Sequence, residues 1–175
     1  HMGPLANEDQ GRAARDGIAK LLEETSVVYG DPKGEGLEGL AEGPGCFVTP
    51  LLLKVNDPDQ CTLVHQLEVF GPVATIIPYD DSVASACDGV QRGGGCLVSA
   101  IYGDDNRFLR DAVMRLSGWN GRLVITDAKV AEQAYAPGMV LPHLMHGGPG
   151  RAGGGQELGG LRGLALYQQR TALQG

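Results

Sequence analysis

Residues 73–126 read VATIIPYDDSVASACDGVQRGGGCLVSAIYGDDNRFLRDAVMRLSGWNGRLVIT, and this stretch decides the fold. Short apolar runs alternate here with segments in which apolar residues recur every three or four positions. This alternation predicts strands that are joined by crossover helices, and such connections produce parallel sheets. The predicted strands are 73–79, 96–102 and 122–126, and the predicted helices are 82–92 and 105–116. The sequence therefore predicts an α/β fold with a mostly parallel sheet and crossover helices.

Both predicted helices carry residues that explain where they begin and stop. Side-chain oxygens can accept hydrogen bonds from the free amides of a first helical turn. The candidates are Asp80, Asp81 and Ser82 for the first helix, and Asp104 or Asp105 for the second. Gly93 and Gly118 lie where the two helices are expected to end.

The amino-terminal part of the chain is less regular. Apolar residues at helical spacing predict an amphipathic helix over 9–24, and a β-branched run predicts a strand at 26–29. Residues 30–45 are rich in glycine and acidic side chains and predict a surface loop. Residues 46–55 predict a strand or hairpin arm, part of which Pro50 confines to an edge or a bend.

Composition limits the size and the partners of the protein. A chain of 175 residues with 42% hydrophobic content can bury one sizeable core, so a single domain is expected. The net charge is -7, and the 14 Lys and Arg residues form no basic run that could follow a phosphate backbone. No apolar run approaches the roughly 20 residues that cross a bilayer. We therefore expect a cytoplasmic protein that binds neither nucleic acid nor membrane.

The four cysteines match no metal-binding or redox spacing. Cys87 lies on the apolar face of a predicted helix and Cys96 opens a predicted strand, where thiols usually pack as small hydrophobic groups. Cys46 and Cys61 have no basic neighbour in the sequence that would favour the thiolate. The chain therefore offers no candidate nucleophile, and no metal site is expected.

Residues 146–155 read HGGPGRAGGG and contain a formal Gly-x-Gly-x-x-Gly pattern at Gly148, Gly150 and Gly153. A dinucleotide-binding fingerprint needs a strand before it, a helix after it, and an acidic residue about 20 positions further on. The preceding residues make a poor strand, and the chain ends without that acid, so the pattern does not meet the requirement. The glycines instead indicate close backbone packing or approach to a ligand, ahead of a helix candidate over 156–167.

Residues 68–73 read EVFGPV and lead directly into an apolar run. Glu68 and Phe70 are two positions apart, so an extended backbone would present them side by side at a strand edge. The carboxylate can accept protons from hydroxyl groups, and the aromatic side chain can pack against a flat ring. This pair suits a ribose-bearing cofactor.

The stretch 68–72 closely resembles the signature of the NAD(P)-dependent aldehyde dehydrogenases. Two further stretches are similar to motifs of that family, and the three motifs occur along this chain in the same order as in the family. Residues 45–50 resemble the strand before the glutamate motif, and 147–167 resemble a glycine-rich stretch near the carboxyl end. Within the family, 146–155 looks most like the branch that oxidises CoA-thioester semialdehydes in phenylacetate or benzoate breakdown, where the dehydrogenase can be fused to a hydratase.

The resemblance implies roles for individual residues. Glu68 would hold the hydroxyls of the nicotinamide ribose, and Phe70 would pack beside it. His146 stands where the family usually has an aromatic residue that lines the substrate tunnel, so it would line that tunnel or, as the alternative, be a surface or packing histidine. The implied cofactor is NAD or NADP, and the implied reaction oxidises an aldehyde to a carboxylic acid. In the family a cysteine thiolate attacks the aldehyde and a glutamate activates water, and neither group has a counterpart in this chain.

The resemblance also implies a domain assignment. Residues 1–2 look like a vector remnant, and 3–175 correspond to the C-terminal portion of an aldehyde dehydrogenase catalytic domain, without the N-terminal cofactor domain. We expect this portion to be inactive alone and to form a homo-oligomer through exposed sheet edges and apolar surface. A second hypothesis is a free-standing α/β scaffold or regulatory module that has the family fold and no catalysis.

Overall fold

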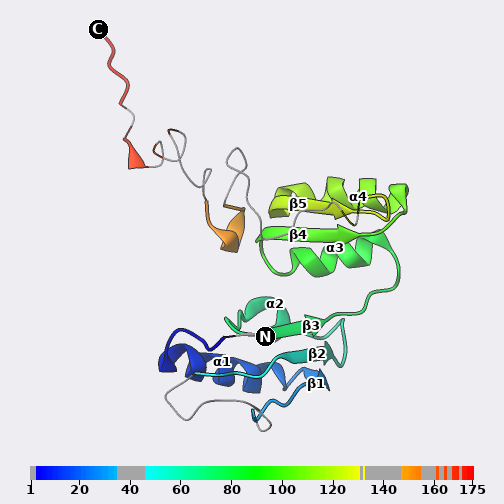
Figure 1. The fold of residues 1–175 in the computed structure, drawn as a ribbon. Coiled ribbons are helices and arrows are strands. Elements are labelled where there is room, and N and C mark those ends of the chain that lie inside the picture. Colours follow the sequence, from blue (N-terminus) through cyan, green and yellow to red (C-terminus); the bar gives the residue numbers. More distant parts are fainter. Residues whose placement is uncertain are drawn as a thin grey trace. The chain divides into compact units, whose positions relative to one another are not determined.

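The described helices and strands are grouped around two sheets (Figure 1). The structure is a computed structural model, and it describes residues 3–34, 46–130, 132, 147–154, 161, 164, 167–169 and 171–175. The chain divides into two compact units, His1–Asp80 and Asp81–Gly175. Chain length predicted one core, but each unit has a core of its own, because its helices pack on its own sheet.

The first unit packs one long helix against a three-stranded sheet (Figure 1). Its elements are α1 (Glu8–Leu21), β1 (Thr25–Tyr29), β2 (Leu51–Val55), α2 (Leu63–Gln66) and β3 (Val73–Ile76). Strand β2 lies in the middle, antiparallel to β1 and parallel to β3. Ile18 and Leu21 of α1 form the core with Leu51 and Leu53 of β2.

Helix α1 confirms the amphipathic helix that the sequence predicts near 9–24. The Asn7 side chain caps it by accepting a hydrogen bond from the Gln10 amide at 2.9 Å. The Thr25 hydroxyl donates to the carbonyl of Leu21 at 2.7 Å, which satisfies a carbonyl of the last turn. The buried side of the helix holds Gly11, Ala14, Gly17, Ile18 and Leu21. On this buried side the small residues come first, up to Gly17, and the two large ones follow at the carboxyl end of the helix.

Strand β2 is shorter than the predicted 46–55 segment. Pairing begins only after Pro50, which has no amide hydrogen to donate to a neighbouring strand. Before it, Cys46 makes an isolated bridge to Leu5, whose amide donates to the Cys46 carbonyl at 2.8 Å. The expected break at Pro50 is therefore present, and only the second half of the segment is a strand.

The second unit is a parallel strand pair covered by two helices (Figure 1). Its described elements are α3 (Val83–Gln91), β4 (Cys96–Tyr102), α4 (Asn106–Leu116), η1 (Ser117–Trp119), β5 (Asn120–Thr126) and η2 (Gly150–Ala152). Cys87 of α3 and Ala112 of α4 share a core with Ile101 of β4 and Leu123 of β5. Helix α4 is the crossover between the two parallel strands, as the sequence predicts.

The strand pairing corrects one prediction. The α/β class with parallel strands and crossover helices is confirmed, but 73–126 does not form one continuous sheet. Strand β3 pairs with β2, in the register Leu51 with Val73, whereas β4 pairs with β5. Strand β2 lies upstream of the quoted stretch, so its preference for β3 is a long-range contact that hydrophobic periodicity does not reveal.

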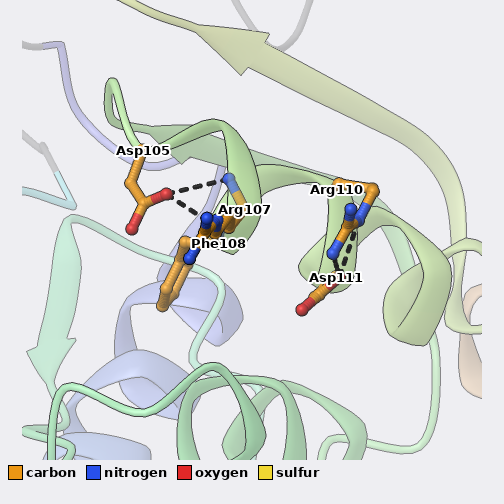
Figure 2. Close-up of polar contacts among 5 residues, drawn as sticks. All are labelled: Asp105, Arg107, Phe108, Arg110 and Asp111. Atoms are coloured by element: carbon orange, nitrogen blue, oxygen red, sulfur yellow. Dashed lines mark hydrogen bonds and ion pairs between the residues drawn. The ribbon is translucent and has the colours of Figure 1, made fainter.

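The caps of α3 and α4 are now assigned. Ser82 caps α3 by accepting from the Ser85 amide at 3.1 Å. Asp105 caps α4 by accepting from the amides of Arg107 at 2.8 Å and Phe108 at 3.2 Å (Figure 2). Each helix therefore begins at one of its predicted candidates. Among the described residues, no helix combines the length and apolar character needed to span a membrane.

Candidate functional site

The stretch between α2 and β3 presents two side chains on one side and anchors two on the other. Leu67 and Val69 pack against the core of the first unit. Glu68 is exposed, and 73% of Phe70 is exposed. Leu67 has extended backbone angles, φ -97° and ψ 121°, so alternate side chains point to opposite sides. Glu68 and Phe70 are thus both exposed, whereas the residues that alternate with them, Leu67 and Val69, pack against the core.

Helix α1 holds this stretch through its small residues. A Cβ atom placed on Gly17 would lie 2.7 Å from the Val69 Cγ2 atom, which is closer than side chains approach each other. A Cβ atom placed on Gly71 would touch the Ala14 Cβ atom at 3.4 Å. Glycine at position 17 thus lets Val69 approach the helix, and Val69 in turn fixes the backbone between Glu68 and Phe70.

Main-chain hydrogen bonds complete the anchoring. The Gly71 amide donates to the Val69 carbonyl at 2.9 Å, and the Val73 amide donates to the Gly71 carbonyl at 2.8 Å. The Leu51 amide donates to the Pro72 carbonyl at 2.9 Å, which ties the turn to the first residue of β2. The pair is therefore carried by a turn that is fixed at both ends, and a fixed turn loses little conformational freedom when a ligand binds.

The Glu68 carboxylate is available as an acceptor. Within the part of the chain that the structure describes, it accepts no hydrogen bond and forms no ion pair. A carboxylate that was buried and satisfied internally could not hold hydroxyl groups of a ligand. The geometry therefore leaves both oxygens of this side chain open for a bound molecule.

The pair stands at the amino end of β3, next to a surface hollow. The hollow has a volume of about 390 Å³ and is lined by Tyr29, Pro50, Leu51, Leu52, Gly71, Pro72, Val73 and Ala74. Parallel sheets commonly bind ligands at the carboxyl ends of their strands. The exposed pair in this unit lies at the opposite end of its strand, where the anchored turn brings it.

The thiols that the structure describes are suited to packing. Cys61 and Cys87 are each only 1% exposed. Burial raises the pKa of the Cys87 thiol, which keeps it protonated. The Cys61 thiol donates to the Pro58 carbonyl at 3.3 Å. Cys87 thus agrees with its prediction as a core cysteine, whereas Cys96, predicted to pack in the same way, is only partly buried. Burial gives neither Cys61 nor Cys87 the access that a nucleophile requires.

One statement about Cys61 needs correction. The sequence shows no basic neighbour, but one turn of chain brings the His65 Nε2 atom to 3.5 Å from the Cys61 Sγ atom. The spacing of four residues at the start of α2 is the signal that could have revealed this contact. The searched residues contain no group of three or more His, Cys, Asp or Glu side chains that could hold a metal ion.

The glycine-rich segment packs by its backbone. A Cβ atom on Gly121 of β5 would overlap the Gly147 carbonyl oxygen, and one on Gly148 would overlap the Cys96 carbonyl oxygen. The Arg151 amide donates to the Gly94 carbonyl at 3.0 Å. Of the two interpretations that the sequence left open, close packing is therefore the one seen for 147–154. His146 and most of the 156–167 helix candidate lie outside the described residues.

The comparisons with known proteins agree with the resemblance. The model of the aldehyde dehydrogenase family matches residues 1–170 of this chain. The chain belongs to the aldehyde dehydrogenase family. Its fold is similar to part of a solved structure, a variant of 1-pyrroline-5-carboxylate dehydrogenase from Thermus thermophilus. That match has a TM-score of 0.72 and 23% identity, and it covers 94% of this chain and 28% of the other.

Two curated relatives are more similar in sequence. Protein MaoC from Klebsiella aerogenes is 37% identical over 174 residues, which are 99% of this chain and 50% of that protein. The 3,4-dehydroadipyl-CoA semialdehyde dehydrogenase from Aromatoleum evansii is 40% identical over 149 residues, which are 85% of this chain and 28% of that protein. This aldehyde dehydrogenase chain thus spans half or less of the length of these relatives.

Proposed function

We propose that this chain is the part of an NAD(P)-dependent aldehyde dehydrogenase that holds the nicotinamide end of the cofactor. In this proposal Glu68 accepts hydrogen bonds from the ribose hydroxyls, and Phe70 packs beside the nicotinamide. The observation that carries the proposal is the outward-facing pair itself. Both side chains are exposed on one side of a stretch that Leu67 and Val69 anchor to the core.

The chemistry of the pair fits this ligand. A carboxylate has two oxygens and accepts hydrogen bonds without donating any, which matches two neighbouring hydroxyl groups. Hydrogen bonds to an ionised group are stronger than those between neutral groups. An exposed aromatic side chain offers a flat apolar surface to another ring. The nicotinamide ribose is the same in NAD and NADP, so Glu68 serves either cofactor.

The residues of this chain bind and orient, and they do not break bonds. When bound, the cofactor supplies the acceptor for a hydride from the substrate. Glu68 fixes the sugar next to that acceptor, and Phe70 covers one side of it against water. Orientation of this kind lowers a reaction barrier because reacting atoms no longer have to find one another.

The proposed substrate is an aldehyde, and the proposed class is a CoA-thioester semialdehyde. The support is the 40% identity to a 3,4-dehydroadipyl-CoA semialdehyde dehydrogenase. His146 is proposed to line the substrate tunnel. A role in phenylacetate or benzoate breakdown follows from the same likeness and is proposed with it.

We propose that residues 3–175 are the C-terminal portion of the catalytic domain and are inactive alone. Buried thiols at Cys61 and Cys87 support this proposal, since neither can reach a substrate. The nucleophile, the general base and the adenosine pocket would then come from polypeptide outside this chain. An exposed carboxylate beside an exposed ring favours the enzyme over the alternative of a scaffold, which needs neither.

The first test compares two samples, the 175-residue chain and a longer protein that includes the upstream coding sequence. The longer protein is expected to reduce NAD or NADP when an aldehyde, including a CoA-thioester semialdehyde, is added. The shorter chain is expected to show no reduction. Activity of the shorter chain would contradict the inactivity proposed for it, and an inactive longer protein would contradict the enzyme assignment.

The second test is Glu68→Gln in the longer protein. Loss of hydrogen bonds to a charged acceptor should raise the KM for NAD(P) by about tenfold to hundredfold. Glu23→Gln is the matched control, because Glu23 is an exposed carboxylate of the same unit in the turn after α1. A KM that Glu68→Gln leaves at the control value would exclude Glu68 from the cofactor site.

A further inference from the structure

Helix α2 lies immediately before the cofactor-binding pair, and its first turn is capped from elsewhere in the chain. Thr62 occupies the N-cap position, but its side chain makes no capping hydrogen bond. A helix of only four residues cannot satisfy its own first amides. The amides of this turn instead face the carboxylate of Glu24, which lies 38 residues earlier in the turn between α1 and β1.

Both oxygens of the Glu24 carboxylate accept hydrogen bonds from this turn. Its Oε2 atom accepts from the Leu63 amide at 2.8 Å, the Thr62 amide at 2.9 Å and the Val64 amide at 3.4 Å. Its Oε1 atom accepts from the Thr62 hydroxyl at 2.9 Å. A negative charge at a helix start is favourable, and each of these hydrogen bonds is charge-assisted. The carboxylate thus replaces the missing cap of α2.

Glu24 is itself held in place by its backbone. Its amide donates to the Leu21 carbonyl at 3.1 Å, at the end of α1. Its carbonyl accepts from the Asn56 amide at 2.9 Å, just after β2. The backbone of Glu24 is hydrogen-bonded to the end of α1 and to the residue after β2, and its carboxylate is hydrogen-bonded to α2. Glu24 therefore fixes the position of α2 relative to α1 and β2.

The position of α2 in turn determines where the Glu68 and Phe70 side chains begin. The Leu67 amide donates to the Leu63 carbonyl at 2.8 Å, and the chain becomes extended at Leu67. Glu68 is the next residue, so the place where α2 stops decides where the alternation of outward and inward side chains begins. A shift by one residue would turn Glu68 inward and Val69 outward.

We propose that Glu24 is a positioning residue for the cofactor-binding pair: its carboxylate holds α2 in place, and α2 sets the direction of Glu68 and Phe70. The inference rests on the function proposed above for that pair. Glu24 touches neither cofactor nor substrate in this proposal and acts only through α2.

The ionisation of Glu24 agrees with this role. Burial of the carboxylate acts to raise the pKa of Glu24, but the hydrogen bonds from Thr62, Leu63 and Val64 outweigh it and hold the pKa below its ordinary value. Because the pKa is lower in the folded state, the stabilisation is present above the ordinary carboxyl range and is lost as pH falls through the lowered value. The other ionisable side chains on the surrounding segments are Lys20, Glu23, Lys54, Asp57, Asp59, Cys61 and His65.

The first test measures amide hydrogen exchange in the 175-residue chain and needs no cofactor. Glu24→Gln should speed exchange of the 63–67 amides by about tenfold, the effect of losing charge-assisted hydrogen bonds. The core amides of Ile18 and Leu53 should keep their rates. Glu23→Gln is the control and should leave all of these rates unchanged. Equal rates in the two variants at 63–67 would overturn the proposal.

A spectroscopic readout separates positioning from simple stability. In the native chain, the amide resonances of Glu68 and Phe70 should shift with pH together with those of Leu63, at a midpoint below the ordinary pKa of a glutamate. The shift should vanish in Glu24→Gln and persist in Glu23→Gln. Should Glu24→Gln not fold, Thr62→Val removes only the hydroxyl donor and should loosen the same amides to a smaller degree. The proposal would be overturned if the amide resonances of Glu68 and Phe70 did not shift as Glu24 titrates.

Kinetics of the longer protein then link positioning to binding. Glu24→Gln should raise the KM for NAD(P) several-fold with kcat little changed, because the pair is misplaced before the cofactor binds. If Glu68→Gln leaves KM unchanged, the proposed function fails. If Glu68→Gln raises KM and Glu24→Gln does not, only the positioning role fails. The two ideas are therefore tested separately.

Discussion

Asp105 shows how one side chain fixes an element of this molecule. Its carboxylate accepts from the amides of Arg107 and Phe108 and begins α4 (Figure 2). Phe108 then packs against the core of the second unit. The ion pair of Arg110 and Asp111 is short, at 2.9 Å, but the Arg110 side chain is 71% exposed and that of Asp111 is 45% exposed, so the pair adds little to stability. The cap rather than the ion pair holds this end of the helix.

A cap of this kind can be tested by removal. Asp105→Ala should lower the free energy of unfolding by about 1 kcal/mol, because two amides lose their acceptor. Asp105→Asn keeps a side-chain oxygen and should stay within a few tenths of a kcal/mol of the native chain. Urea denaturation of the three proteins measures the difference. Equal losses in both variants would show that the charge and not the cap matters.

At the scale of elements, α1 is the support on which the site is built. The small residues of its buried side admit Val69, and the turn at its end carries Glu24. The first contact holds the stretch between Glu68 and Phe70 from behind, and the second holds the helix that precedes it. Because both contacts come from α1 and the turn that follows it, the orientation of Glu68 and Phe70 depends on α1 as well as on the sequence around the two residues.

Gly17→Ala tests the first support. A methyl group would gain about 1 kcal/mol of helix propensity, but overpacking against Val69 costs about 1–3 kcal/mol. We expect a small net loss of stability, measured by thermal unfolding, and a larger loss of NAD(P) binding in the longer protein. Gly89→Ala is the control, since Gly89 lies in α3 with open space where its Cβ atom would be. An unchanged affinity for NAD(P) in Gly17→Ala would contradict the idea that the contact between Gly17 and Val69 orients Glu68 and Phe70.

Gly121→Ala tests the backbone contact of the glycine-rich segment. The added methyl group would overlap the Gly147 carbonyl oxygen, and a main-chain atom cannot swing aside as a side chain can. We expect a loss of about 1–3 kcal/mol in unfolding free energy. Gly118→Ala is the control, because nothing lies within 4 Å of the position of its Cβ atom. If both variants have the same free energy of unfolding, the packing of 147–154 does not depend on the close contact between Gly121 and the Gly147 carbonyl.

Sequence patterns were sufficient where the cause of a structure is local. Ser82 and Asp105 begin their helices, and Glu68 and Phe70 point to one side, because caps and alternation are set by nearby residues. Sequence patterns failed where a structure depends on a contact with a residue far away in the sequence. Helix α2 was not predicted, since its cap is the distant Glu24. The partner of β3 was missed for the same reason, and so were the packing at Gly17 and the proximity of His65 to Cys61.

At the scale of the whole molecule, the outer strand β1 is the feature with the widest consequence. Among the described residues it pairs only with β2, and its Val27, Val28 and Tyr29 side chains are exposed. An edge strand with apolar side chains is a surface on which further strands can pair. We propose that other polypeptide can join the sheet at this edge in a longer protein, and that the edge favours self-association of the 175-residue chain.

Light scattering tests self-association. The native 175-residue chain is expected to be a homo-oligomer, and Val28→Lys should shift it toward the monomer, because a charge on an edge strand opposes pairing. Val130→Lys is the control, since Val130 is also exposed, at 41% against 53% for Val28, but lies outside any strand. A monomeric native chain, or an equal shift in both variants, would contradict a role for β1.

The glycine contact between 147–154 and the β4–β5 pair has an evolutionary consequence. Gly121 and Gly148 each meet a carbonyl oxygen of the main chain, so the fit depends on the absence of a side chain and not on its chemistry. Any side chain at either position would therefore overlap the main chain. Residues on either side of such a contact can therefore be exchanged without loosening the join between 147–154 and the strand pair.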